Sequence, residues 1–553
     1  MPTPPRLPLV IHEDDHLLVV NKPAGLNTHS PSPFSGEGVY DWLRYREPRW
    51  SNLAIIHRLD KETSGVLVFG KTPIANRTLT QQFTEGSIRK KYLLMTDRPV
   101  HLGQFTVKSA LVRTGEKYVS RPEHAGAVRA ITHFRVRMER EGLTVVNAEP
   151  ATGRTHQIRV HAAERGFPIL GDALYGGTPA ARLCLHAEEL TLKHPATGAE
   201  TTFRTPADFP RDPASPQLRQ SAVARIPLRE GLIDPELTNA YRVVHGASDG
   251  WPGWYVDRLG QFLLSQSAQP LTREQQEFLG KLLAHIATQQ ATPTTPSGAY
   301  HKLLTRTTRH ATATESSPHH VLGETAPDRF HVHENGAQFE LSFCEGYSVG
   351  LFLDQRDNRR RFLTNHVAAN FPVFLNGPAG AEVLNTFAYT CGFSVCAAIA
   401  GARTTSIDLS KKYLEWGKRN FTANQRNPAE HEFIYGDTFD WLRRLAKKGR
   451  QFDVSVLDPP TFSRSKEHGS FQVERDYSKL VMASLPLLRS GGVLLASTNS
   501  ATWEAEEFLA TVKAAAHPSR RKIVQQHYVP QPPDFPISRL EPAYLKTVWL
   551  RLE

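Results

Sequence analysis

An alternation of strand-like and helix-like segments, from about residue 330 to the end of the chain, constrains the fold more than any other feature. Apolar runs at 383–387, 404–407 and 454–457 have the composition of buried strands, and 411–424 has the spacing of an amphipathic helix. A turn and a further strand-like run follow at 491–497. Strands that alternate with helices form a parallel sheet covered by helices, so residues 329–553 are predicted to be an α/β, Rossmann-like domain with a mostly parallel sheet.

Two further units are expected before this domain. Residues 1–212 contain short strand-like runs between Gly and Pro turns, which indicates a β-rich domain. Prolines at 210, 213 and 216 mark a connector, and we place a linker at 213–229. Residues 230–328 are predicted to form a small α/β domain, because a capping-box pattern at 272–275 precedes apolar residues on one helical face.

Charge and composition limit the kind of partner. Lys and Arg total 66 against 55 Asp and Glu, a net charge of +11, which favours a polyanion such as nucleic acid but also fits a basic enzyme. No apolar run approaches the roughly 18 residues of a membrane helix, and the N-terminus lacks a signal core. The four cysteines show no zinc spacing, so we expect a cytoplasmic protein without a metal or a membrane partner.

A charged turn in the N-terminal unit is the first candidate site. Asp60 lies between Arg58 and Lys61, just ahead of a strand-like run at 66–69. This placement suits an aspartate that stays ionised, although an Asp in a solvated turn would look the same. Other polar stretches accompany it at 21–26, 90–93, 152–161, 171–176, 182–187 and 194–198.

Together these stretches resemble the RluA-type RNA pseudouridine synthases over residues 10–210, in the order and spacing of that family. The resemblance implies an α+β catalytic domain with a mixed antiparallel sheet that needs no cofactor. It also implies that Asp60 is the catalytic aspartate, that Tyr92 stacks on the target base and that Arg159 pairs with the aspartate. A carboxylate can add covalently to the substrate, and a guanidinium keeps it ionised. We further expect substrate contacts from Arg58, Arg154 and His156.

The second candidate site lies in the Rossmann-like domain. The loop at 384–394 occupies the position of a nucleotide-binding loop but holds a single glycine, Gly392, so it is not a dinucleotide fingerprint. Asp408 ends the next strand-like run, where an acid can bind ribose hydroxyls. Asp437 follows the third run, and Asp458-Pro459-Pro460-Thr461-Phe462 ends the fourth.

These pieces, with 335–336 and 350–359, resemble S-adenosylmethionine-dependent RNA methyltransferases of the large-subunit rRNA type. A Trp-rich stretch at 249–258 resembles the small domain that precedes such enzymes. The resemblance implies S-adenosylmethionine as cofactor and RNA as partner, either large-subunit rRNA or tRNA. Asp408 would hold the ribose, Asp437 the adenine end, and Asp458 would lie near the methyl group and the target base. The remaining expected cofactor contacts are Gln355, Asn385, Phe387, Thr390, Gly392 and Pro459.

The methylated atom is constrained by the cysteines. Methylation at carbon 5 of cytosine needs a cysteine nucleophile, yet the positions after the Asp-Pro-Pro motif read Thr461-Phe462-Ser463, and no cysteine follows Cys396. Asp-Pro-Pro-Thr-Phe-Ser resembles relatives that make 7-methylguanosine, so guanine N7 in 23S rRNA is the expected target.

Alternatives stay open at this point. They are cytosine C5 methylation, a nicotinamide dehydrogenase in the second half, and an RNA-binding ribosome-assembly factor with one half inactive. The charged run at 359–361 could contact RNA or form a solvated helix face.

Overall fold

The computed structural model describes residues 7–36, 38–123, 129–209, 228–288, 297–304, 317–345, 348–465, 469–519 and 521–553. The chain divides into two compact units. Unit 1 comprises the described residues of 1–31, 37–41 and 52–234, and unit 2 comprises those of 32–36, 42–51 and 235–553. Most of the predicted linker, residues 213–227, lies outside the described residues. Residues 42–51 are therefore part of unit 2 although they lie within the first predicted domain.

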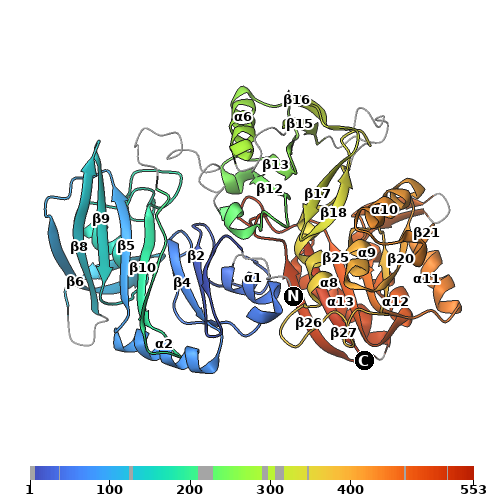
Figure 1. Cartoon of the computed structure of the whole chain (residues 1–553), viewed down its shortest axis with the longest axis horizontal. Coiled ribbons are helices and arrows are strands. Elements are labelled where there is room, and N and C mark those ends of the chain that lie inside the picture. Colours follow the sequence, from blue (N-terminus) through green and yellow to red (C-terminus); the bar gives the residue numbers. More distant parts are fainter. Residues whose placement is uncertain are drawn as a thin grey trace. The chain divides into compact units, whose positions relative to one another are not determined.

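Unit 1 is built on an 11-stranded sheet (Figure 1). Its path runs β1-β2-β4-β10-β5-β9-β8-β6-β7, with β3 beside β4 and β11 beside β10. The β4–β10 pair is parallel and the other strand pairs of this sheet are antiparallel. The strands are β1 Val10–Glu13, β2 Leu17–Lys22, β3 Ala54–Ile55, β4 Ser64–Gly70, β5 Arg89–Thr96, β6 Gln104–Thr114, β7 Lys117–Arg121, β8 Arg129–Arg140, β9 Leu143–Pro150, β10 Leu185–Lys193 and β11 Glu200–Arg204. The helices are α1 Val39–Arg46, whose residues 42–46 belong to unit 2, α2 Pro73–Glu85 and α3 Gln157–Glu164.

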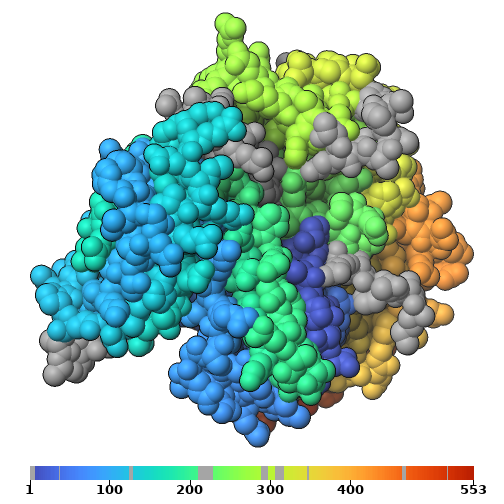
Figure 2. Space-filling model, turned by 60° about the vertical axis from the view of Figure 1, so that its left-hand side comes forward, coloured from blue at the N-terminus to red at the C-terminus, as the bar shows by residue number. Residues whose placement is uncertain are grey.

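Long-range pairing brings the ends of unit 1 together. The β10–β11 hairpin lies beside the first strands, and Figure 2 shows its green surface against the dark blue N-terminal segment. His194 contacts Asp14 there, with Nε2 3.1 Å from Oδ2. These contacts enclose β4, which is buried along its whole length, so the loop that precedes it is held by a rigid strand.

The part of unit 2 after residue 350 has a seven-stranded sheet in the order β21-β20-β19-β22-β25-β27-β26. Pairs from β21 to β25 are parallel, whereas β27 is antiparallel to both β25 and β26. Its elements are α8 Arg356–Thr364, β19 Glu382–Thr386, α9 Gly392–Ala400, β20 Arg403–Asp408, α10 Lys411–Ala423, β21 Glu432–Tyr435, α11 Thr438–Lys447, β22 Phe452–Leu457, α12 Val473–Ser484, β25 Leu488–Thr498, α13 Ala505–Ala516, β26 Ile523–Pro530 and β27 Lys546–Leu552. A short hairpin, β23 Phe462–Ser465 and β24 Gly469–Gln472, follows β22.

A five-stranded sheet, β12-β13-β14-β15-β16, forms the rest of unit 2 with α6 Arg273–Thr288 (Figure 1). The strands are Ala240–His245, Trp254–Leu259, Phe262–Ser267, Gly298–Leu303 and His319–Gly323. The hairpin β17 Phe330–Glu334 and β18 Ala337–Leu341 follows. Phe262 of this sheet and Phe362 of α8 belong to one continuous apolar core, which explains why the part before residue 329 clusters with the part after it.

Candidate active sites

The loop that carries Asp60 is fixed from behind by residues 21–28. The ammonium group of Lys22 is fully buried and donates to the carbonyl oxygens of Pro23, Leu26 and Lys61 at 2.9, 2.7 and 3.1 Å. The Thr28 hydroxyl donates to Leu59 O at 2.9 Å and accepts from Leu59 N at 3.1 Å. The backbone is thus held on both sides of Asp60, whose side chain lines a cavity of about 1200 Å³.

Arg159 is the cation beside Asp60. Its Nη1 lies 3.9 Å from Asp60 Oδ2, while Nε and Nη2 bind the two oxygens of Asp172 at 2.7 and 2.8 Å. Burial opposes the charge on Arg159, but the Asp172 carboxylate more than offsets this effect, so the pKa of Arg159 is raised. Asp172 is 1% exposed and fixes the guanidinium plane, leaving one Nη free for Asp60. Asp172 was not among the predicted site residues, although the 171–176 stretch contains it.

The other predicted residues of this site line the same cavity: Arg58, Tyr92, Arg154 and His156. Tyr92 comes from β5, and burial together with the Asp60 charge raises its pKa, so the phenol stays protonated at neutral pH. His156 Nε2 lies 3.9 Å from Asp60 Oδ2. Arg58 and Arg154 are exposed, and Arg154 donates from Nε to Arg129 O at 3.2 Å. The Asp60 carboxylate thus has the basic groups of Arg159 and His156 beside it, and the ring of Tyr92 lines the same cavity.

In unit 2, the loop after β19 has an unusual backbone. Phe387, Tyr389 and Cys391 have φ angles of 53°, 49° and 63°, in the left-handed region that non-glycine residues rarely adopt. Asp408, at the end of β20, accepts from Tyr389 N and Ser410 N, each at 2.8 Å. Burial raises the pKa of Asp408, and these two bonds oppose the rise. The carboxylate thus shapes the loop and still has lone pairs that can accept further hydrogen bonds.

Three other predicted cofactor residues make contacts within the protein. Asn385 Nδ2 donates to Ser394 Oγ at 2.8 Å, and Thr390 Oγ1 donates to Gly350 O at 2.6 Å. Asp437 accepts from Asp440 N at 3.2 Å as the N-cap of α11. The buried side chains of Asn385 and Thr390 fix the loop, so any contact they make with a cofactor would come from their backbone.

Asp458 directly follows β22 and is held by the segment before α8. Gln355 Nε2 donates to Asp458 Oδ1 at 3.0 Å and to Ser497 Oγ at 2.8 Å, and Asn358 Nδ2 donates to Gln355 Oε1 at 2.7 Å. Burial, followed by the charge of Asp354, raises the pKa of Asp458 to about 7. Gln355 therefore binds the catalytic candidate directly, and Asp354 is a second carboxylate that the prediction did not name as a site residue.

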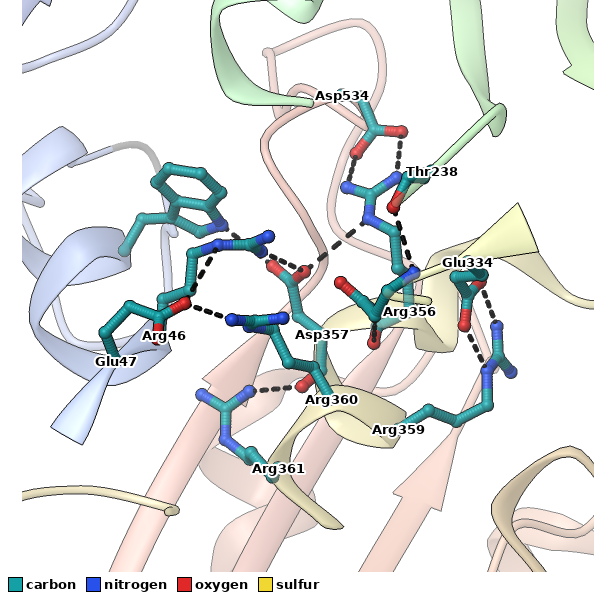
Figure 3. Close-up of polar contacts among 12 residues, drawn as sticks. Arg46, Glu47, Thr238, Glu334, Arg356, Asp357, Arg359, Arg360, Arg361 and Asp534 are labelled. Carbon is teal, nitrogen blue, oxygen red and sulfur yellow. Dashed lines mark hydrogen bonds and ion pairs between the residues drawn. The ribbon is translucent and has the colours of Figure 1, made fainter. Parts of the chain in front are cut away.

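Buried ion pairs fix α8, which follows Gln355 (Figure 3). Arg356 pairs with Asp534 at 2.8 and 2.5 Å, and Arg359 binds both oxygens of Glu334 at 2.7 Å. Arg360 bonds Glu47. Residues 359–361 are 3–7% exposed, so they are neither a solvated face nor an RNA contact. The local charge pattern is typical of a solvent-exposed face, but Arg359 and Arg360 pair with Glu334 and Glu47, which are distant in sequence, and Arg361 donates to Asp357 O one turn earlier.

Residues 42–51 complete this network within unit 2. Trp42 Nε1 donates to Asp357 Oδ2 at 2.9 Å, and Arg46 lies 3.7 Å from Asp357 Oδ1.

Within the described residues no group of His, Cys, Asp and Glu has the arrangement of a metal site. Among the described helices none is long and apolar enough to cross a membrane.

Two family models match this chain. The model of the S-adenosylmethionine-dependent methyltransferase family matches residues 241–551, and the chain belongs to this family. Residues 16–164 match the model of RNA pseudouridylate synthase. The predicted pair of enzyme families is thereby confirmed, as is S-adenosylmethionine as the cofactor of the second, and the nicotinamide dehydrogenase alternative is wrong.

Individual relatives match the second half. The "Ribosomal RNA large subunit methyltransferase" of Deinococcus radiodurans is 33% identical over 321 residues, 57% of this chain and 73% of that protein. "Ribosomal RNA large subunit methyltransferase I" of Escherichia coli is 30% identical over 324 residues, 58% of this chain and 76% of that protein.

A solved structure, "Human RNA Pseudouridylate Synthase Domain Containing 4", is 26% identical and covers 36% of this chain and 88% of that chain, with a TM-score of 0.30.

Proposed function

We propose that this enzyme makes two modifications in large-subunit ribosomal RNA. Residues 1–212 convert a uridine to pseudouridine, and residues 329–553 methylate guanine N7, while residues 230–328 assist RNA binding. Both relatives described above are named for methylation of this RNA. We also expect the enzyme to act in the cytoplasm.

For the first activity, the supporting observation is the position of Asp60. The carboxylate lies in an open cavity, 3.9 Å from a guanidinium that a buried partner holds in place. An ionised carboxylate of this kind can attack the sugar of a flipped uridine, while Tyr92 offers a face for the base. Arg58 and Arg154, exposed on the same cavity, are placed to bind the RNA backbone.

For the second activity, the two cysteines at the predicted cofactor loop support nitrogen as the methylated atom. Burial raises the pKa of Cys391 to about 12 and that of Cys396 further, so neither thiol is available as a nucleophile. Guanine N7 has a lone pair and needs no covalent activation. Its methylation makes the base cationic, and the neighbouring carboxylates of Asp354 and Asp458 would stabilise that charge.

The test is nucleoside mapping of rRNA and tRNA from cells that lack this protein and from cells that carry wild type, Asp60→Ala or Asp458→Ala. One pseudouridine should disappear with Asp60→Ala alone and one 7-methylguanosine with Asp458→Ala alone. Loss of a 5-methylcytidine instead would refute the nitrogen target, and a change confined to tRNA would refute the rRNA substrate. If cells that lack the protein kept every pseudouridine or every 7-methylguanosine, the corresponding half would act only as an RNA-binding factor. If the modification were lost in those cells but kept with the variant, the role of Asp60 or Asp458 would be refuted.

A further inference from the structure

His156 has a backbone conformation that directs its ring into the Asp60 cavity. It precedes α3 with φ 57°, a left-handed conformation that costs a non-glycine residue free energy and that often marks a functional position. Its Nε2 lies 3.9 Å from Asp60 Oδ2, and its side chain is 17% exposed. The ring therefore presents one nitrogen to the space in which the target uracil would turn.

The other nitrogen of His156 is held by Tyr175. Nδ1 lies 2.8 Å from the Tyr175 hydroxyl, and the same oxygen accepts the Tyr118 backbone N–H at 2.9 Å. A hydroxyl oxygen has two lone pairs, so it can accept both bonds at once. When the imidazole is protonated, Nδ1–H can donate to Tyr175 while Nε2–H faces Asp60.

The isomerisation has a proton step that is separate from the attack by Asp60. Once C5 of the uracil has bonded to C1′ of the ribose, C5 still carries its hydrogen and N1 carries none. Pseudouridine forms when the C5–H bond breaks, its electron pair restores the ring double bond, and N1 gains a proton. One group that accepts a proton and returns it completes the step without any co-reactant.

We propose that His156 is this proton-transfer residue: neutral Nε2 takes the proton from C5, and the resulting imidazolium delivers it to N1. Asp60 is a free carboxylate again once the C5–C1′ bond has formed, so its negative charge faces the imidazolium when that cation appears. Burial lowers the pKa of His156, which keeps the ring neutral and able to accept at neutral pH, although Asp60 opposes the shift.

The other groups at this point suit the role less well. Arg159 is bound through two nitrogens to Asp172 and has a raised pKa, so it stays a cation. Tyr92 also has a raised pKa, so its phenol stays protonated and is a poor acceptor of the C5 proton. Lys90 lines the same cavity, and burial lowers its pKa, which makes it the competitor to exclude by experiment.

The experiment uses the full chain and a ribosomal RNA fragment that wild type converts. The target base is uridine, 5-deuterouridine or 5-fluorouridine, and the last has no C5 proton to lose. With uridine, His156→Gln should slow single turnovers about 10²-fold or more, the usual size of a general-base contribution. An isotope effect from deuterium should appear, and added imidazole should restore rate. Conversion of 5-fluorouridine into its C5-linked product should keep the wild-type rate.

Controls separate this role from structure and from the proposed function. Arg154→Gln should slow uridine and 5-fluorouridine alike through weaker RNA binding, and Asp60→Asn should abolish both conversions. If Asp60→Asn stayed active, the proposed role of Asp60 as the nucleophile would be refuted, whatever the result for His156. The proton-transfer role would be overturned if His156→Gln slowed both bases equally, if no isotope effect appeared, or if Lys90→Met produced the isotope effect instead.

Discussion

Replacement of Asp534 by Asn should destabilise unit 2 strongly, because it leaves a buried arginine without its counter-charge. Asp534 is 0% exposed and Arg356 2% exposed, and their two bonds are 2.8 and 2.5 Å long. Removal of one partner from a buried pair costs about 3–5 kcal/mol. Asp357, 3.6 Å from Arg356 Nε, compensates in part, so we expect about 3 kcal/mol, the lower end of that range.

Urea unfolding followed by tryptophan fluorescence measures this effect in the intact chain. All eight tryptophans lie in unit 2, so the signal reports that unit. With a urea slope of about 3 kcal/mol/M, the midpoint should fall by about 1 M. Glu277→Gln is the matched control, because its pair with Arg273 on α6 is exposed and should contribute at most about 0.5 kcal/mol. A loss below about 1 kcal/mol for Asp534→Asn would refute the reasoning that buried charge fixes α8.

Four further predictions concern the two sites. Because the pKa of Asp458 is about 7 and its anion is the active form, methylation should rise with pH through about 7 and then level off, and this step should be absent from the pH profile of Asp458→Asn. The same raised pKa means that the folded state holds this proton up to about pH 7, so stability from this group falls as pH rises from 3.8 towards 7; urea midpoints of wild type should drop over that window more than those of Asp458→Asn. S-adenosylmethionine at 100 times its Kd should raise the unfolding free energy of unit 2 by about 2.7 kcal/mol in the fluorescence assay, and no change would contradict a folded cofactor site. Asp172→Asn should lower the kcat of pseudouridylation at least about 10-fold with little change in KM, since Arg159 loses its orienting partner; an effect on KM alone would show that the pair serves RNA binding.

The sequence reveals features that depend on local pattern. Apolar runs and their spacing place β2, β4, β19, β20 and β22, because burial of one face requires that spacing wherever the strand ends up in the fold. Aspartates at strand ends, such as Asp408 and Asp458, follow from the same pattern, since the carboxyl ends of parallel strands meet at one edge of a sheet. Both enzyme families could therefore be predicted from motifs alone.

Features that depend on distant partners could not be predicted in this way. Asp172 orients Arg159, and Tyr175 binds His156, through contacts that only the folded chain creates. The arginines of α8 have a charge pattern typical of a solvated helix. Arg359 and Arg360 are nevertheless buried, because they pair with Glu334 and Glu47 from other segments. Residues 42–51 join unit 2 for the same reason.

What the sequence by itself determined is thus the chemistry available in each half: a carboxylate with a base platform in the first and a cofactor-binding sheet in the second. The tertiary structure decided which charges are exposed to substrate and which are buried as supports. The physical reason is that the cost of a buried charge depends on the partner that faces it, and chain spacing does not reveal that partner.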